Sequence, residues 1–574
     1  MQRVAPPLGH TVRAGLCVGV PVALGYALGH VTVGVTIGLA CVLRTIGERE
    51  APNRQNVTTL LIATPLAAVG YLFGPAQDLP LVPLVLLMAA FAFVAGTLAP
   101  HGEGFALGGM QVLLVASIAL GVPDTGTAAA IGWFLLGASI YAAAMAFDLF
   151  VLEPRRPERI ALSALDGVVA ALLATPGPAQ RSAAHAALAA ARRVPSPGWT
   201  RSDAGVARWG AYVAVVDAAD DLVAWEGAAG AADGERREAY RDARTGWQHG
   251  RAPGGAAAAE LRPPAPGPVA RPWTERWLPD ARTRAHAGRL ALCFGLAVSS
   301  RAWVGLDHWF WVPATVGLVL QPDFGSVVGR AVLRVAGTIA GSALAAAILW
   351  AVPDGVGIGI AVGLVAATIP WAKQASYVMQ SVALAAVILL LVDQIAPATG
   401  TLGLPEQRVL ATAVGGAIVL VFGYLVWPAA RRVAISGPMT AATGALATLV
   451  RTAAEPVPAG EAQRADRRAT AVAARQHAFD ALASTRVPLA RAAAEPPPAS
   501  TDAAAWADAV GAVEALAMAV SDHAIARLGG TPPLPGSGEL ATAVEGLGRT
   551  QDPAVVQEQA RSLGRRINSE SDVS

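Results

Sequence analysis

The side chains best suited to chemistry lie close together in one segment of the chain, residues 307–341. An acid and a histidine there can exchange a proton near neutral pH, tryptophans can contact aromatic rings, and arginines can bind a carboxylate through two parallel hydrogen bonds. Within a membrane, ionisable residues are rare, and they usually mark the path of a substrate or an ion. The candidate pathway residues are Asp307, His308, Trp309, Trp311, Pro313, Pro322, Asp323, Arg330, Arg334 and, farther along the chain, Arg408.

The proline, the second acid and the arginines of this segment also have a structural interpretation. Pro322 and Asp323 could end one helix and cap the next, because Asp accepts hydrogen bonds from the free backbone N–H groups at a helix start. Arg330 and Arg334 lie four residues apart on one helix face, so they could anchor the topology. The functional alternative is an anion-attracting pair at the cytoplasmic mouth of a transport path.

The aromatic residues and the histidine leave two interpretations open as well. Trp309 and Trp311 could belong to the aromatic belt at the membrane interface, or they could contact an aromatic substrate. His308 could be an interfacial histidine without a role. Alternatively, His308 and Asp307 form the pair that takes up and releases a coupling proton, since imidazole titrates near neutral pH.

The motifs of common enzymes and metalloproteins are missing from the sequence. The only lysine, Lys373, follows Ala372 and not the glycine that a phosphate-binding P-loop requires. The segment His101-Gly102-Glu103 lacks the second histidine of a zinc-protease helix, and the 9 histidines are scattered. No serine stands in a nucleophile elbow. We therefore expect no enzymatic activity, no cofactor and no metal ion.

Composition places these residues in a membrane. Hydrophobic residues make up 54% of the chain and charged residues only 15%, with the charges bunched between long apolar runs such as 81–99 and 411–427. Such runs approach the roughly 20 residues that a helix needs to cross a hydrocarbon core of about 30 Å. The net charge of +2 is too small to suggest a nucleic-acid-binding protein. The lipid bilayer is therefore an expected partner, and nucleic acid is not.

The apolar runs predict twelve spans, six in each half of the chain. The second span of each half, 31–43 or 309–320, would cover only about 20 Å as a helix, and short segments at matching places in two halves often mark a transport site. The predicted spans are 14–29, 31–43, 57–74, 79–99, 105–121, 128–152, 287–303, 309–320, 335–351, 356–370, 376–392 and 408–427.

Arginines are concentrated in alternate loops, which predicts the orientation of the spans. Short cytoplasmic loops of membrane proteins are rich in Arg and Lys. One set of loops holds most of the arginines near the span ends, whereas the other set holds Asp78, Asp124, Asp354 and Asp393. We therefore expect both termini and both polar parts of the chain in the cytoplasm. Because each half has an even number of spans, the two halves are expected to be parallel repeats.

Apolar and polar parts alternate twice along the chain. A first transmembrane repeat at 1–152 precedes a cytoplasmic helical domain and linker at 153–285, and a second repeat at 286–430 precedes a C-terminal cytoplasmic helical domain at 431–574. Alanine-rich stretches with helical spacing predict antiparallel bundles in the polar parts. The predicted fold class is all-α: a polytopic membrane protein with two parallel repeats of about six transmembrane helices, each followed by a cytoplasmic bundle.

The segment that begins at His308 resembles the fusaric acid resistance (FUSC-like) family. HWFWVPATVGLVLQPDFGSVVGRAVLRVAGTIAG is similar to the family pattern H-x-Y-W-V-x-L-T-x-x-x-V-x-Q-P-D-x-x-x-T-x-x-R-x-x-x-R-x-x-G-T-x-x-G, and the order of six spans and a helical region, twice, is similar too. The chain departs from the family at Val327, where Thr is frequent, and at Ala411, where a carboxylate is common. The resemblance implies an inner-membrane exporter of aromatic carboxylic acids.

These observations lead to one main functional hypothesis and two alternatives. The main hypothesis is a secondary transporter of the inner (plasma) membrane that exports small, aromatic organic acids and is driven by the proton-motive force, because duplicated spans accompany a missing ATPase motif. The alternatives are an organic-anion channel and a membrane scaffold that recruits partners through its cytoplasmic bundles. Assembly as a homo-oligomer or with an accessory efflux protein is left open.

Overall fold

The chain is helical throughout the part that the structure describes. In the computed structural model, the elements of the described residues are α-helices joined by short 3-10 and π segments, and no strand occurs among those residues. This confirms the all-α prediction. The described residues are 8–48, 53–121, 126–148, 156–175, 177–192, 194, 203–228, 234–249, 280–320, 327–397, 403–426, 435–456, 458, 460–494, 499–528 and 531–572.

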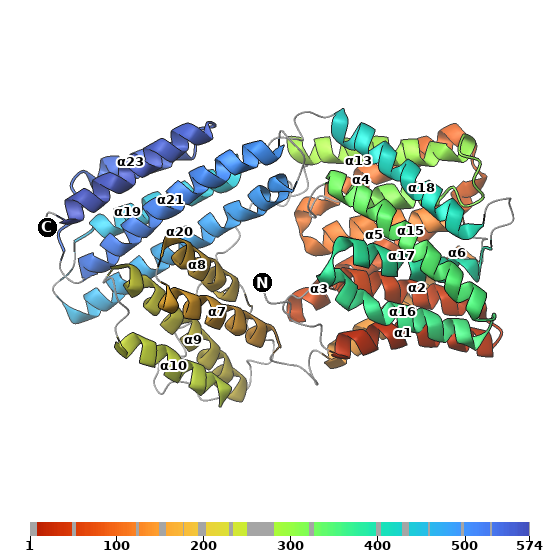
Figure 1. Cartoon of the computed structure of the whole chain (residues 1–574), viewed down its shortest axis with the longest axis horizontal. Coiled ribbons are helices and arrows are strands. Elements are labelled where there is room, and N and C mark those ends of the chain that lie inside the picture. The colour runs from red at the N-terminus through yellow and green to blue at the C-terminus, as the bar shows by residue number, and fades with distance from the viewer. Residues whose placement is uncertain are drawn as a thin grey trace. The chain divides into compact units, whose positions relative to one another are not determined.

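The helices form two compact units, and each unit joins segments that lie far apart in the sequence. The first unit contains Met1–Pro154 and Pro268–Ala430, and the second contains Arg155–Gly267 and Arg431–Ser574. The two predicted transmembrane repeats therefore belong to one unit, and the two predicted cytoplasmic domains belong to the other (Figure 1). The linker predicted between them falls almost entirely on residues outside the described part.

Twelve α-helices of the described residues make up the first unit, one at the place of each predicted span. Short turns connect most of them, and they lie roughly parallel or antiparallel to one another (Figure 1). They are α1 (Leu8–Ala27), α2 (Val31–Gly47), α3 (Asn53–Val69, continued by η1 at Gly70–Asp78), α4 (Leu81–Leu98), α5 (Glu103–Ala119), α6 (Thr127–Phe147), α13 (Ala281–Ser299), α14 (Trp311–Val319), α15 (Val327–Ala351), α16 (Val356–Ala375), α17 (Tyr377–Asp393) and α18 (Leu404–Ile418, continued by η5 at Val419–Leu425).

Seven segments of the described residues are helical, long and apolar enough to cross a membrane, which makes the chain a multi-pass membrane protein. Six of them belong to the first unit. The seventh lies in the second unit within α21 (Ala499–Leu528), which buries Val513, Leu516 and Val520 in a helical bundle, so packing accounts for its apolar composition. Twelve crossings remain a prediction. The seven segments are Asn56–Asp78, Leu81–His101, Thr127–Phe147, Val328–Ala351, Val356–Ala375, Leu404–Leu425 and Ser500–Arg527.

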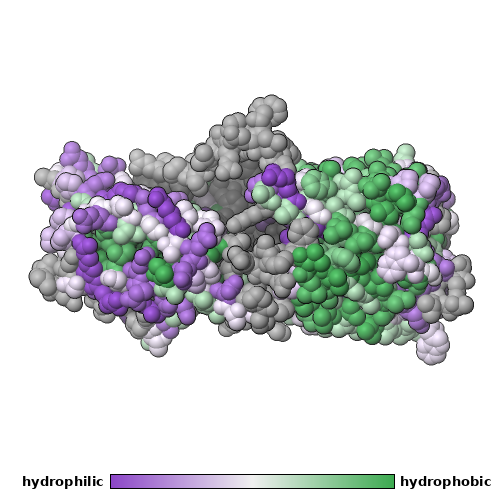
Figure 2. Space-filling model, turned by 90° about the horizontal axis from the view of Figure 1, so that it is seen from above, coloured by the Kyte–Doolittle hydropathy of each residue, from purple (hydrophilic) through white to green (hydrophobic). Residues whose placement is uncertain are grey.

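Four helices of the first unit are enclosed by the others. Most residues of α2, α5, α14 and α17 are buried, including every residue of α14. The surrounding helices instead turn large apolar side chains outward: Leu61 of α3 is 70% exposed, Leu86 of α4 is 65% and Leu364 of α16 is 69%. Figure 2 shows one side of the first unit, which is broadly apolar. A surface of this kind is the one that lipid tails would cover.

The second helix of each half differs from its predicted length. α2 has 17 residues and α14 has only 9, so they span about 25 Å and about 14 Å at 1.5 Å per residue. α2 continues to Gly47, four residues beyond the predicted end of the span at residue 43. Arg44 does not stop α2, because its guanidinium donates hydrogen bonds to Thr64 at 2.8 Å and to Gln111, which keeps the side chain fully buried within the unit.

The first helix of each half packs against the fourth helix of the other half. α1 contacts α16, and α13 contacts α4. The backbones approach closely at glycines: a Cβ added to Gly19 would lie 2.7 Å from the Gly363 Cα, and one added to Gly96 would lie 2.8 Å from the Ala287 Cα. Small residues allow such close contact between helices in membranes. The two halves are therefore interlocked within one unit.

The second unit is a set of helices built from both polar parts of the sequence. Each polar part has its own hydrophobic core. The two parts are joined where α8 packs on α20 and α9 packs on α21, and where buried Asp220 pairs with Arg192 at 2.7 Å and with Arg475. The helices are α7 (Arg156–Ala174), α8 (Pro178–Arg192), α9 (Asp203–Ala228), α10 (Gly234–Gln248), α19 (Ser436–Ala454), α20 (Glu461–Ala493), α21, α22 (Ser537–Leu547) and α23 (Pro553–Asp572).

Candidate functional site

Arg408 and Trp311 form the centre of a buried polar cluster in the first unit. Arg408 lies near the start of α18 and is 1% exposed, and its guanidinium carbon lies 4.2 Å from the centre of the Trp311 ring on α14. A guanidinium over an indole face is a favourable cation–π contact. The helices can approach because Gly415 has no side chain: an added Cβ there would lie 2.9 Å from the Cβ of Thr315. The pair is therefore held by two closely packed helices.

Arg334 is a second buried arginine in the same cluster. It lies on α15, is 2% exposed, and donates a hydrogen bond to the hydroxyl of Tyr377 at the start of α17. The positive charges of Arg334 and Arg408 act on one another. Like charges repel strongly in a low-dielectric interior, so an arrangement of this kind favours a negative charge between or beside them.

Several donor groups of this cluster have no hydrogen-bond partner among the described residues. A buried polar group without a partner costs about 1–3 kcal/mol, and a charged one costs more. Guanidinium and indole N–H groups only donate, and hydroxyls can donate as well, so what the cluster needs is an acceptor. The unpartnered atoms are Nε and Nη2 of Arg334, Nε and Nη1 of Arg408, Nε1 of Trp311, and the hydroxyl oxygens of Thr338, Ser342 and Ser381.

Arg330 has a different environment from Arg334, although both were predicted on one helix face. Arg330 is 6% exposed, and its Nε donates a hydrogen bond to the carbonyl oxygen of Val319 at 3.1 Å. Val319 is the last residue of α14, so Arg330 caps that helix, which agrees with the anchoring interpretation. Of the two arginines, Arg334 is the one for which we keep the anion-binding interpretation. Pro313 lies buried on α14, whereas Pro322 and Asp323 lie outside the described residues.

Asp307 and His308 are joined through a residue that the sequence analysis did not single out. The amide nitrogen of Gln407 donates to Asp307 at 3.3 Å, and its oxygen accepts the His308 backbone N–H at 3.0 Å. His308 Nδ1 also lies 3.2 Å from that oxygen, and Nε2 lies 2.8 Å from the carbonyl oxygen of Ala396. Both ring nitrogens of His308 thus face oxygen atoms. Trp309 lies apart from this group, with Arg301 5.8 Å from its ring centre.

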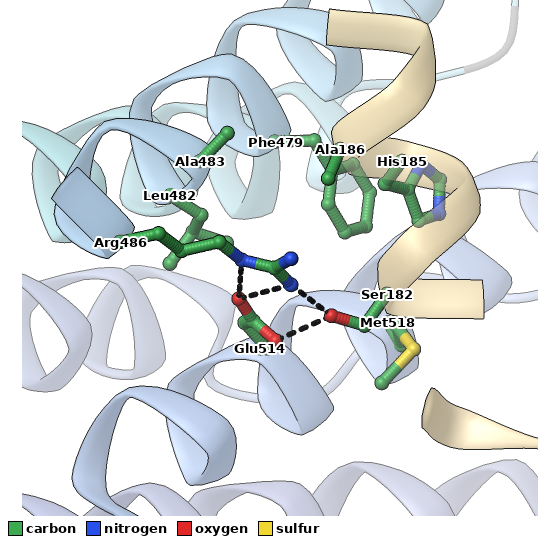
Figure 3. Close-up of a pocket in the computed structure, with 9 residues that line it drawn as sticks. All are labelled: Ser182, His185, Ala186, Phe479, Leu482, Ala483, Arg486, Glu514 and Met518. Carbon is green, nitrogen blue, oxygen red and sulfur yellow. Dashed lines mark hydrogen bonds and ion pairs between the residues drawn. The ribbon is translucent and has the colours of Figure 1, made fainter. Parts of the chain in front are cut away.

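A pocket in the second unit offers fewer unpaired polar groups to a ligand than the cluster around Arg408 (Figure 3). Its polar groups satisfy one another: Ser182 donates to Glu514 at 2.6 Å, and Arg486 donates to Glu514 at 3.0 Å. His185 stacks on Phe479 with ring centres 3.6 Å apart. Burial of the imidazole, with the nearby charge of Arg475 adding to it, lowers the pKa of His185 to about 3, so this ring is neutral at physiological pH. We therefore regard the cluster around Arg408 as the candidate functional site.

A comparison with protein families found a match in this part of the chain. Residues 292–422, from α13 to η5, match the family described as fusaric acid resistance protein-like. They form a fusaric acid resistance protein-like domain. The match confirms the resemblance predicted from the sequence and implies a membrane transporter. The domain contains the whole donor cluster and every candidate pathway residue. No curated protein and no solved structure was found to match the chain.

Sequence reasoning found the arginines and the tryptophan of the site but missed the polar residues that surround them. Gln407 stands directly before Arg408 near the start of a largely apolar helix, and this was a signal that could have been used. Ser342 and Ser381 were hidden because single serines are frequent in membrane helices. Among the described residues, no group of three or more His, Cys, Asp or Glu side chains is arranged to hold a metal ion.

Proposed function

We propose that the chain is a secondary transporter of the inner membrane that exports small organic acids, aromatic ones in particular. The observation that carries the proposal is the pair of buried arginines, Arg334 and Arg408, each of which has two guanidinium nitrogens without a hydrogen-bond partner among the described residues. A carboxylate matches the planar fork of a guanidinium with two parallel hydrogen bonds. It would also offset the repulsion between the two positive charges.

The surroundings of the arginines support an aromatic substrate. Trp311, which contacts Arg408, and the neighbouring Phe310 are both fully buried, with their ring centres 4.8 Å apart. Aromatic rings pack favourably against each other at such distances, and the free indole N–H can donate to a carboxylate or a phenolic oxygen. A substrate with a ring at one end and a carboxylate at the other would satisfy both features of the site.

In this proposal, both termini and the second unit are cytoplasmic, and the two halves of the first unit are parallel repeats that rock against each other. The exchange of helices between halves, α1 onto α16 and α13 onto α4, supports this arrangement, since each half makes the equivalent contact with the other. The proton-motive force supplies the energy. His308 and Asp307, linked by Gln407, are the proposed coupling pair.

The test is binding of benzoate to the full-length protein in detergent, measured by isothermal titration calorimetry. Arg334→Gln and Arg408→Gln should each weaken binding roughly tenfold to a hundredfold, because losing a charged hydrogen-bond partner costs about 1.5–3 kcal/mol. Arg301→Gln is the matched control, since Arg301 is exposed and donates to the carbonyl oxygen of Gln77 away from the cluster. Equal affinity in all four proteins would overturn the proposal.

Transport in proteoliposomes separates this proposal from a channel. A carrier should accumulate benzoate against its gradient when a pH gradient is imposed. A channel would only let the anion run down its electrochemical gradient, insensitive to a proton ionophore once the membrane potential is clamped. A membrane scaffold would show neither behaviour.

A further inference from the structure

A cluster of charged side chains lies at one end of the first unit, away from the arginine–tryptophan site. His10 and Arg13 lie in the first turns of α1, and Glu48 and Asp148 directly follow α2 and α6. The four side chains are between 4% and 11% exposed. Three helices therefore bring one imidazole, one guanidinium and two carboxylates together in a buried place.

The contacts within the cluster are direct. Arg13 forms ion pairs with both Glu48 and Asp148. His10 Nε2 lies 3.2 Å from Glu48 and 3.9 Å from Asp148, so the imidazole faces the same two carboxylates as the guanidinium. The second oxygen of Glu48 accepts a hydrogen bond from the Tyr141 hydroxyl at 2.7 Å. Each carboxylate therefore lies beside both the guanidinium of Arg13 and the imidazole of His10.

Other titratable groups face the cluster from the neighbouring helices. Lys373 of α16 donates to the carbonyl oxygens of Ile46, at 2.8 Å, and Glu48, and so contacts the end of α2. Arg44 of α2 turns its guanidinium to Thr64 and Gln111. The thiol of Cys17, one turn farther along α1, feels the charges of both Arg13 and Glu48.

The two carboxylates show what the cluster would bind. An opposite charge within about 4–6 Å favours the charged form of a titratable group. The His10 imidazole lies 3.2 Å from Glu48 and 3.9 Å from Asp148, so the arrangement of α1, α2 and α6 seen here favours its protonated form.

We propose that His10, Glu48 and Asp148 form a proton-binding site of this protein, at the end of the first unit opposite to His308. The placement follows α1. Tyr26, near the far end of α1, contacts Gln394 just after α17, and His308 contacts Ala396 of the same turn. His10 and Tyr26 are 16 residues apart, or about 24 Å along the helix.

This inference rests on the proposed proton-coupled transport, to which a proton site at this end of the first unit would contribute. A proton that crosses with each cycle must be taken up at one end and released at the other. Loss of the proton from His10 would loosen the contact among α1, α2 and α6. Lys373 would carry that change to the second half, because it links α16 to the end of α2.

The first experiment detects the proton without any substrate. Full-length protein labelled with nitrogen-15 histidine is placed in lipid nanodiscs and titrated by NMR, and His10→Gln identifies the His10 signal among the 9 histidines. We expect His10 to be cationic at neutral pH and its titration midpoint to fall in Asp148→Asn. Glu48→Gln is the second variant, and gives the same readout if Asp148→Asn does not fold. A neutral His10 at neutral pH, or a midpoint that neither variant moves, would overturn the proposal.

The second experiment tests coupling in proteoliposomes with benzoate. His10→Gln should retain benzoate counterflow but lose at least about tenfold of the accumulation driven by a pH gradient. Accumulation equal to wild type would sink the coupling role. If wild-type protein moves no benzoate at all, the proposed transport fails, while the NMR titration still decides whether His10 binds the proton.

Discussion

The guanidinium carbon of Arg408 lies 4.2 Å from the centre of the Trp311 ring, yet its Nε and Nη1 have no hydrogen-bond partner among the described residues. The aromatic face stabilises the charge but cannot accept hydrogen bonds from the N–H groups as a carboxylate would. The contact thus holds the arginine in place while leaving its directional donors available. This arrangement supports the proposed binding of an anion at Arg408.

Conservative substitutions of Arg408 and of Trp311 should separate the contribution of the guanidinium to binding from that of the aromatic ring. Arg408→Lys keeps the charge but loses the planar fork, so we expect benzoate to bind about tenfold more weakly. Trp311→Phe keeps an aromatic face and removes one N–H donor, which is worth about 0.5–1.5 kcal/mol, or roughly twofold to tenfold in affinity. Calorimetry on both variants checks this. A larger loss in Trp311→Phe than in Arg408→Lys would mean that the ring, and not the charge, dominates binding.

The predicted orientation can be tested by cysteine labelling. The native cysteines, Cys17, Cys41 and Cys293, are buried and should give little background. Cysteines introduced at Asp78 and Asp354 should react with an impermeant thiol reagent added outside intact cells, whereas one at Arg155 should react only after the cells are opened. The reverse pattern would invert the topology.

His308 should be needed for energy coupling but not for binding. His308→Gln removes the titrating group while retaining an amide that can bond to Gln407, so counterflow of benzoate should persist and accumulation driven by a pH gradient should fall at least about tenfold. His101→Gln, which changes a histidine outside the matched domain, is the control. Normal accumulation in His308→Gln would assign coupling to another residue.

His185 should make the second unit sensitive to acid. Burial, with Arg475, Arg192 and Arg181 adding their charges against the opposing effect of Asp220, lowers the pKa of His185 to about 3, while an unfolded histidine titrates at about 6.5. Below about pH 6.5 the unfolded chain gains a proton that the folded unit does not take up. Stability should therefore fall as the pH drops towards 3, by at most about 1.4 kcal/mol for each pH unit from this residue.

The variant His185→Phe should remove this part of the acid sensitivity while keeping the ring stacked on Phe479. Hydrogen exchange of α8 peptides in the full chain, followed as a function of pH, is the measurement. The same pH slope in wild type and variant would show that another group is responsible.

Asp217 affects stability in the opposite direction from His185, because its contribution is lost as the pH rises. Burial, together with the negative charge of Asp220 and against the charge of Arg192, raises the pKa of Asp217 to about 6. An unfolded aspartate titrates at about 3.9, so the unfolded chain loses its proton first as the pH rises. The contribution of Asp217 to stability is thus lost between about pH 4 and pH 6 and is absent at neutral pH.

Replacing this carboxyl with an amide should stabilise the second unit at neutral pH. Asp217→Asn is compared with Asp221→Asn, which removes half-exposed ion pairs to Arg236 and Arg468 and should change stability by less than about 1 kcal/mol. Thermal unfolding of both variants checks this. No gain in Asp217→Asn would contradict the assignment of a buried, costly carboxylate.

The amino-acid sequence by itself determined where the helices of this protein lie and which of them are apolar. In a membrane, a long apolar run satisfies the hydrogen bonds of its own backbone by forming a helix. Such runs can be recognised in the sequence without knowledge of any tertiary contact. Each of the twelve predicted spans therefore has a helix at its place. The signature from His308 to Gly341 likewise identified the domain that the family comparison matched.

Only the tertiary structure decided which charges meet. Arg408 lies 97 positions after Trp311, and Asp148 lies 135 positions after Arg13, so no local pattern could pair them. The structure also separated Arg330 from Arg334. Arg330 donates to Val319 at the end of α14, whereas Arg334 has donors without a partner among the described residues, because different neighbours pack on each part of the helix face. Contacts between residues so far apart in the sequence depend on how the helices of both halves interlock. That is a property of the whole folded unit.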